Sequence, residues 1–190
     1  MNKRSAVKEK YEQFLVDAFI AWWSSQTGEQ FRVISRPKRP DFIVQSDQRS
    51  TWIEVTDAFY SGKWAQDLYS NATLGERHKP IGPWQHTDMD TQTALHFVVL
   101  LKKKLSKPSY AEAYNKYGSG ILLINMQSPW FNDQTCDMMH DECRETDWST
   151  DKGYFSHVFI SFHSLNKQTF EKWEIGGATN SCRRRPKGCD

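Results

Sequence analysis

The chain has 190 residues, a formal net charge of +2, a hydrophobic fraction of 38% and an aromatic fraction of 14%. This length fits one domain with a sizeable core, and the aromatic content excludes an intrinsically disordered chain. No apolar run is long enough to cross a membrane, and the amphipathic start is not a signal-peptide core. We therefore expect a cytoplasmic protein with reduced cysteines and no membrane partner.

The first third of the chain predicts a helix followed by three strands. Apolar residues recur at helical spacing over 5–23. Residues 31–34 predict a first strand, and the apolar, β-branched runs 41–45 and 51–57 predict two more. A turn-prone stretch, 46–49, separates the last two runs, so the three strands can pair as a meander.

The next stretch, 58–90, has no clean period. We expect a long connector here, and loops of this length in a compact domain are often functional. Its aromatic residues either stack on unpaired bases or close a small core over the sheet, and the core interpretation is favoured; these residues are Trp64, Tyr69, Trp84 and His86.

A second helix is predicted over 91–105, with an apolar face formed by Ala94, Leu95, Val98, Leu101 and Leu105. Pro108 disturbs it, and residues 110–117 continue as a further helical turn.

The remaining sequence alternates between apolar runs and polar stretches. Residues 120–126 predict a buried strand, 127–152 are polar, acidic and turn-like, and 157–162 predict a late strand. We expect one domain over 1–165, followed by a basic C-terminal tail over 166–190. The second helix connects the third strand to a later buried strand, which predicts an α/β fold with a central mixed sheet flanked by helices.

Two acidic residues interrupt the apolar strands at 41–45 and 51–57. Side chains alternate along a strand, so Trp52, Glu54 and Thr56 share one face. If Gln45 pairs with Ser50, Asp41 lies opposite Glu54. Like charges in this arrangement destabilise a sheet unless a cation lies between them, and Mg²⁺ suits such a carboxylate pair.

The segments Pro40-Asp41 and Glu54-Val55-Thr56 resemble the motif of the PD-(D/E)XK nuclease superfamily, in which Pro-Asp and Glu-X-Lys are joined by a hairpin. The resemblance covers roughly residues 5–126 and implies a restriction-endonuclease-like αβββαβ core. It implies that Asp41, Glu54 and the carbonyl of Val55 bind Mg²⁺ or Mn²⁺, with Glu12 on the first helix as a third carboxylate. It also implies cleavage of phosphodiester bonds in nucleic acid, with DNA favoured.

The chain departs from this motif at Thr56, which stands where the family has a lysine. A neutral hydroxyl cannot stabilise a pentavalent phosphorane as an ammonium group does. Some members of the superfamily supply the lysine from the following helix. On a helical wheel Lys102 falls on the face of Leu95 and Val98, so Lys102 is the first candidate for the catalytic lysine and Lys104 the second. The alternative is that Lys102 extends along the surface to water.

Basic residues surround these positions. One group lies just before Asp41, and another lies at the end of the second helix and just after it; they are Arg36, Lys38, Arg39, Lys103 and Lys107. Such groups can bind the backbone of nucleic acid, although any one of them taken alone is also typical of a solvated surface. A third group, Arg183–Arg185 with Lys187, lies in the tail.

Cys136, His140 and Cys143 form a C-x3-H-x2-C run. A closed zinc site needs a fourth ligand, for which Cys182, Cys189 or His157 is available. The spacing is near the usual finger patterns but does not match them, so free cysteines are favoured and a structural zinc ion is not expected.

Two functions from different classes stay open. The first is a Mg²⁺- or Mn²⁺-dependent nuclease, and the second is a non-catalytic member of the same fold that binds nucleic acid or another protein. The sequence has no evident base-reading module, so we expect either shape-selective cleavage or specificity supplied by a protein partner or a homodimer.

Overall fold

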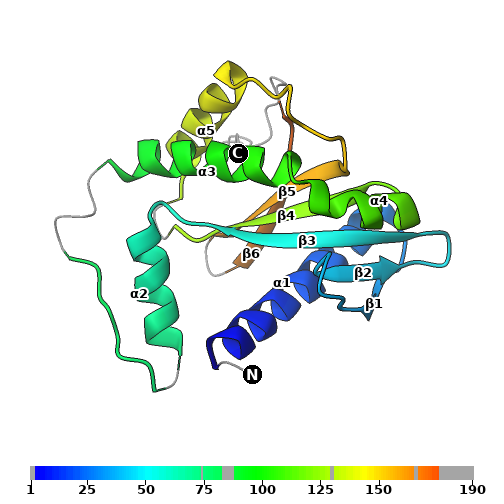
Figure 1. Cartoon of the computed structure of the whole chain (residues 1–190), viewed down its shortest axis with the longest axis horizontal. Coiled ribbons are helices and arrows are strands. Elements are labelled where there is room, and N and C mark those ends of the chain that lie inside the picture. The colour runs from blue at the N-terminus through cyan, green and yellow to red at the C-terminus, as the bar shows by residue number, and fades with distance from the viewer. Residues whose placement is uncertain (1–2, 74, 83–87, 129–130, 165–166, 176–190) are drawn as a thin grey trace, which may run out of the picture.

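The computed structural model describes residues 3–73, 75–82, 88–128, 131–164 and 167–175. Its centre is a six-stranded sheet in which the strands lie in the order of the sequence (Figure 1). The strands are β1 Arg32–Ser35, β2 Phe42–Gln45, β3 Ser50–Ala58, β4 Gly120–Met126, β5 Phe155–Ser164 and β6 Lys167–Trp173.

The sheet is mixed. The first three strands form an antiparallel meander, β4 is parallel to β3, β5 is parallel to β4, and β6 returns antiparallel. The connection from β3 to β4 contains helices α2 Gly62–Ala72, α3 Met89–Leu105 and α4 Ala111–Tyr117, with a 3₁₀ turn at Pro108–Tyr110. Helix α5 Asp133–Glu145 joins β4 to β5. The predicted α/β class with a mixed sheet flanked by helices is therefore confirmed.

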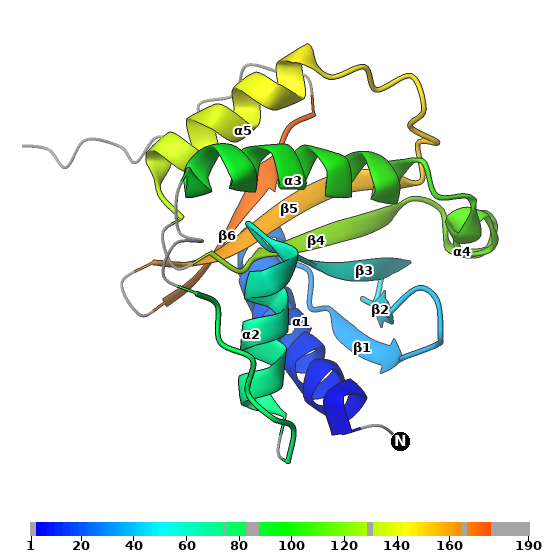
Figure 2. The same cartoon turned by 60° about the vertical axis from the view of Figure 1, so that its left-hand side comes forward.

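Helices cover both faces of the sheet (Figures 1 and 2). Helix α1, Lys3–Thr27, covers one face, where Leu15 and Phe19 lie in one core with Ile53 and Leu123. On the other face, α3 and α5 share a core with alternate residues of the same strands, including Leu122 and Ile124. The described helices include none with the length and apolarity that a membrane span requires.

Three elements were not expected. The predicted connector 58–90 contains α2, which begins where the Ser61 side chain accepts a hydrogen bond from the Trp64 amide. The stretch 127–152 contains α5, because Cys136, Met139 and Cys143 form a narrow buried stripe on an otherwise polar helix. The predicted tail contains β6, which buries only Phe170 and Trp173. In all three the apolar positions are too few for periodicity to reveal them.

The aromatic residues that the sequence singled out in the connector lie in different environments. Trp64 is half-buried, donates a hydrogen bond to the Gln127 carbonyl at 2.6 Å and packs beside Tyr60. Tyr69 lies in α2 and bonds to Asp57. Trp84 and His86 lie outside the described residues.

Strand β3 is longer than its neighbour β2. The pairing of these strands reaches Phe42 opposite Ile53, and β3 then continues to Ala58 alongside β4. The edge of residues 54–58 that faces away from β4 therefore extends past the end of β2. This uncovered segment of β3 positions the site described below.

The contact between Gly120 and Trp52 predicts a large effect of one methyl group on stability. A Cβ atom at Gly120 would lie 2.3 Å from the Trp52 ring, which is fully buried between Tyr110 and Phe155. We expect Gly120→Ala to lower the free energy of unfolding by about 3 kcal/mol. Denaturant unfolding measures this change.

Gly62→Ala is the matched control, since a Cβ atom there meets nothing within 4 Å at the start of α2. Its free energy of unfolding should stay the same or rise by about 0.5 kcal/mol. Equal stability of the two variants would contradict the packing described for Trp52.

Candidate active site

The hairpin of β2 and β3 has the predicted register. Gln45 pairs with Ser50, and Phe42 pairs with Ile53, so Asp41 immediately precedes the first pair and Glu54 immediately follows it. Ile53 and Val55 belong to the core under α1, whereas Trp52 packs on the opposite face with Tyr110. Glu54 lies between Ile53 and Val55 in sequence and therefore points to the face covered by α3 and α4.

Glu54 is buried, with 6% of its surface exposed. Its Oε1 atom accepts hydrogen bonds from Lys104 Nζ and from the Tyr110 hydroxyl, each at 2.8 Å. Its Oε2 atom is also buried but has no hydrogen-bond partner among the described residues. A buried carboxylate oxygen without a donor is costly, and a cation is one means of satisfying it.

Asp41 lies against the uncovered edge of β3. Its Oδ2 atom accepts a hydrogen bond from the Val55 amide at 2.8 Å. Burial, followed by the negative charge of Glu54, raises the pKa of Asp41 to about 6. The N–H and C=O of one residue point to the same edge of a strand, so the Val55 carbonyl also faces the Asp41 side.

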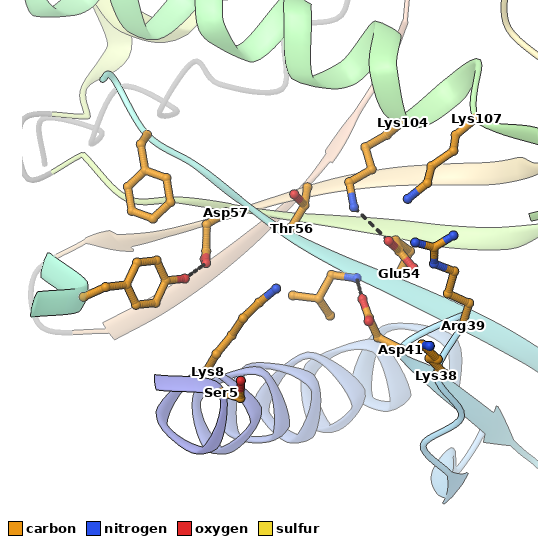
Figure 3. A pocket seen from close by; sticks show the side chains of 13 residues that line it. Ser5, Lys8, Lys38, Arg39, Asp41, Glu54, Thr56, Asp57, Lys104 and Lys107 are labelled. Carbon is orange, nitrogen blue, oxygen red and sulfur yellow. Dashed lines mark hydrogen bonds and ion pairs between the residues drawn. The ribbon is translucent and has the colours of Figure 1, made fainter. Parts of the chain in front are cut away.

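These residues line an open pocket of about 540 Å³ (Figure 3). Besides the two carboxylates, the pocket is lined by Thr56, Asp57 and Phe59 on the β3 side, by Ser5 on α1 and by Tyr69 on α2. Basic side chains enter from several elements: Lys8, Lys38, Arg39, Lys104 and Lys107. The arrangement joins an acidic pair to a ring of cations, which suits a divalent metal together with a phosphate group.

Lys104, not Lys102, reaches the carboxylate pair. The helical wheel gave Leu95 to the inward face of α3, but Leu95 is 45% exposed and the buried face is formed by Ala94, Phe97 and Leu101. The face of α3 that points to the sheet is therefore closer to Lys104, which follows the buried Leu101 by three residues. Lys102 lies instead within electrostatic range of Asp147.

Glu12 is buried near the pocket, although an exposed position is commoner for a helix glutamate. Its carboxylate oxygens lie 3.3 Å from Arg36 Nη2 and 3.4 Å from Lys8 Nζ. Burial raises the pKa of Glu12, and its negative charge contributes to the raised pKa of Asp41. Each carboxylate oxygen of Glu12 has a basic partner, whereas both partners of Glu54 are on Oε1, so Glu12 is less available as a metal ligand than Glu54.

The predicted nucleic-acid-binding residues are divided between the pocket and the surface. Lys38, Arg39 and Lys107 line the pocket. Arg36 bonds to Glu12 and stacks over the Phe42 ring at 4.3 Å, and Lys103 is exposed on α3 away from the pocket. The basic group at 183–187 lies outside the described residues.

Sequence reasoning missed a second set of polar residues at the far end of the pocket. Asp57 accepts hydrogen bonds from the Tyr69 hydroxyl at 2.6 Å, from Asn125 Nδ2 at 3.0 Å and from Gln127 Nε2 at 3.3 Å. Tyr11 accepts from the same two amide groups. Sequence reasoning also did not indicate that Tyr110 contacts Glu54. For the second set, the sequence feature that could have pointed to the pocket is the position of Asp57 directly after Glu54-Val55-Thr56.

Within the described residues, Cys136, His140 and Cys143 are not brought together as metal ligands, and the candidate fourth ligands Cys182 and Cys189 lie outside those residues. Cys136 is in a disulfide, which corrects the expectation of a reduced thiol, and Cys143 is a buried free thiol. The His140 ring stacks on Trp173 at 4.0 Å. Among the described residues, no group of three or more His, Cys, Asp or Glu side chains is arranged to hold a metal ion.

Comparisons of this chain with family models, with curated proteins and with solved structures found no match.

The raised pKa of Asp41 predicts how stability depends on pH without metal. The folded protein holds this proton more tightly than the unfolded chain, because the pKa rises from 3.8 to about 6 on folding. The contribution of Asp41 to stability is therefore fully present below about pH 4 and is lost as pH rises through about 6. Denaturant unfolding in EDTA should show this loss for the natural protein.

Asp41→Asn is the control, since asparagine stays neutral at every pH. Its free energy of unfolding should fall less than that of the natural protein between pH 4 and pH 7. Parallel pH profiles for the two proteins would contradict the electrostatic environment described for Asp41.

Proposed function

We propose that this protein is a metal-dependent nuclease that hydrolyses phosphodiester bonds of nucleic acid, with DNA as the favoured substrate. The observation that carries the proposal is the convergence of Asp41, Glu54 and Lys104 at one open pocket ringed by basic side chains. A carboxylate pair, a cation and a phosphate-binding rim are the groups that metal-assisted phosphodiester hydrolysis requires.

The order of elements supports the resemblance to the PD-(D/E)XK superfamily. Helix α1 precedes the antiparallel meander of β1, β2 and β3, and a helix-containing crossover then leads to β4, parallel to β3. This is the order αβββαβ that the resemblance implies. The acidic residues of the motif lie at the hairpin of β2 and β3, next to the crossover helix that provides Lys104.

The carboxylate pair suits Mg²⁺ or Mn²⁺. Glu54 Oε2 is buried and without a hydrogen-bond partner among the described residues, and Asp41 is held beside it by the Val55 amide. Asp41, Glu54 and the Val55 carbonyl would hold the ion, since Mg²⁺ prefers one or two carboxylates and keeps several waters. When bound, such an ion lowers the pKa of a coordinated water and polarises the scissile phosphate.

Lys104 supplies the cation that Thr56 cannot. Its ammonium group lies 2.8 Å from Glu54 Oε1, and its side chain is only 16% exposed. A poorly solvated ammonium group beside the carboxylates can stabilise negative charge that develops on the phosphate oxygens. In this proposal Lys104 replaces the motif lysine from α3, and Thr56 only lines the pocket.

The basic rim would hold the nucleic-acid backbone. Lys38 and Arg39 precede Asp41, and Lys107 follows α3, so cations from two elements flank the carboxylate pair (Figure 3). Binding through such residues is sensitive to salt and carries little sequence information.

A cleavage assay tests the proposal. With Mg²⁺ or Mn²⁺, we expect the protein to cut plasmid DNA, single-stranded DNA or RNA. Asp41→Asn and Glu54→Gln should reduce the cleavage rate by a factor of about 100 or more, because each removes a proposed metal ligand. Lys104→Ala should reduce it by about 100-fold through lost charge stabilisation.

Lys102→Ala and Lys103→Ala are the matched controls on the same helix and should cleave at nearly the natural rate. Cleavage that survives Glu54→Gln would overturn the nuclease assignment. A folded protein that binds nucleic acid but cleaves none of these substrates with either metal would instead support the non-catalytic alternative.

Tyr110 is expected to orient Glu54 for the metal. Its hydroxyl donates to Oε1 and leaves Oε2 for the ion, and burial followed by the Glu54 charge raises the pKa of Tyr110, so the hydroxyl stays protonated. Tyr110→Phe should weaken Mn²⁺ binding by about tenfold, as calorimetry can measure. Tyr114→Phe, on the same segment with an exposed ring, should bind Mn²⁺ as the natural protein does. Equal Mn²⁺ affinity of the two variants would contradict this role.

A further inference from the structure

The pocket continues well beyond the carboxylate pair. It follows the uncovered edge of β3 from Glu54 to Phe59, a span of roughly 16 Å for an extended strand. Lys104, Lys107 and Arg39 gather near Glu54, whereas Lys8 reaches from α1 toward the part of β3 near Asp57 (Figure 3). A cation from α1 therefore lies on the Asp57 side of the carboxylate pair, apart from the cations beside Glu54, and the length of the pocket exceeds that of one phosphate group.

Lys8 is available to a ligand at this second end. Its side chain is 57% exposed, and its ammonium group lies 3.4 Å from the carboxylate of Glu12, one helical turn away. The pair joins this exposed ammonium group to a Glu12 side chain that is only 9% exposed. Glu12 also has Arg36 as a partner, so a phosphate group can engage Lys8 without leaving Glu12 without a cation.

Phe59 is an apolar ring in a pocket otherwise dominated by charged and polar groups. It lines the pocket, is half-buried, and meets the Tyr69 ring edge-to-face with centroids 5.9 Å apart. The Tyr69 hydroxyl donates a hydrogen bond to Asp57, which also accepts hydrogen bonds from Asn125 and Gln127. Phe59 therefore packs against a tyrosine ring whose position is set by hydrogen bonds. Neither phosphate binding nor metal binding explains why an aromatic side chain lines the pocket here.

We propose that Lys8 and Phe59 form a subsite for the nucleotide next to the scissile phosphate. Lys8 binds the flanking phosphate, and the base of that nucleotide stacks on Phe59. The proposal rests on the proposed function for the position of the scissile phosphate. It goes further by naming the substrate class, because a base inside a duplex is stacked on its neighbours and only an unpaired nucleotide offers its face. Single-stranded nucleic acid is therefore the preferred ligand of this pocket.

Binding experiments test the subsite separately from cleavage. The probe is a fluorescein-labelled oligothymidylate, titrated in Ca²⁺ and followed by anisotropy, with a duplex of matched length as the second probe; a gel verifies that neither is cut. Phe59→Leu should weaken oligothymidylate binding about tenfold and leave duplex binding unchanged, because leucine has no aromatic face on which a base can stack. Phe59→Tyr keeps the aromatic face and should bind as the natural protein does.

Lys8→Gln should weaken oligothymidylate binding and reduce the slope of log affinity against log salt by about 0.7. Lys10→Gln is the matched control, since Lys10 is exposed on the same helix and does not line the pocket. Thermal unfolding of each variant verifies that it is folded.

The outcomes separate the subsite from the proposed function. If the natural protein cleaves but Phe59→Leu and Lys8→Gln bind like Phe59→Tyr and Lys10→Gln, the subsite is wrong and the nuclease assignment stands. If it binds oligothymidylate with the expected losses but cleaves nothing, the subsite stands and the nuclease assignment fails. Equal or tighter binding of the duplex by the natural protein overturns the single-strand preference.

Discussion

The burial of the Glu54 carboxylate is the constraint on which the site depends. A carboxylate in the core is tolerated only with donors or cations, and both of its donors come from the connection between β3 and β4. Leu101 and Leu105 fix the rotation of α3 that carries Lys104 to Glu54, and Trp52 packs against the Tyr110 ring. Packing on one face of the sheet therefore sets the geometry of the acidic pair.

The strands β1 to β5 were all predicted, and the signal is strongest where the run is apolar and β-branched. Residues 42–44, 51–55 and 120–126 are buried, so their sequence carries the signal by itself. Helices α2 and α5 and strand β6 carry few apolar residues, and they depend on caps and on contacts with distant elements. Sequence periodicity contains little information about such contacts.

The site was predictable where its geometry is local. Asp41 and Glu54 belong to one hairpin, so alternation and loop length are enough to place them side by side. Lys104 and Tyr110 lie far from Glu54 in sequence, and their approach depends on the rotation of α3 and on the 3₁₀ turn after it. The prediction of Lys102 was wrong because Leu95 was assigned to the buried face of the helix, whereas it is exposed. One apolar side chain at the edge of a helical face is enough to shift the face that is inferred.

The charges of the pocket also link the two proposed ligands. Asp57 is occupied by three hydrogen bonds and Glu54 by Lys104, so Asp41 and the unpartnered oxygen of Glu54 are the groups that would repel a phosphate. A divalent cation removes this repulsion, and a phosphate in turn offsets the excess of basic side chains around the ion. Each ligand should therefore raise the affinity for the other, which is the coupling that metal-assisted phosphodiester chemistry needs.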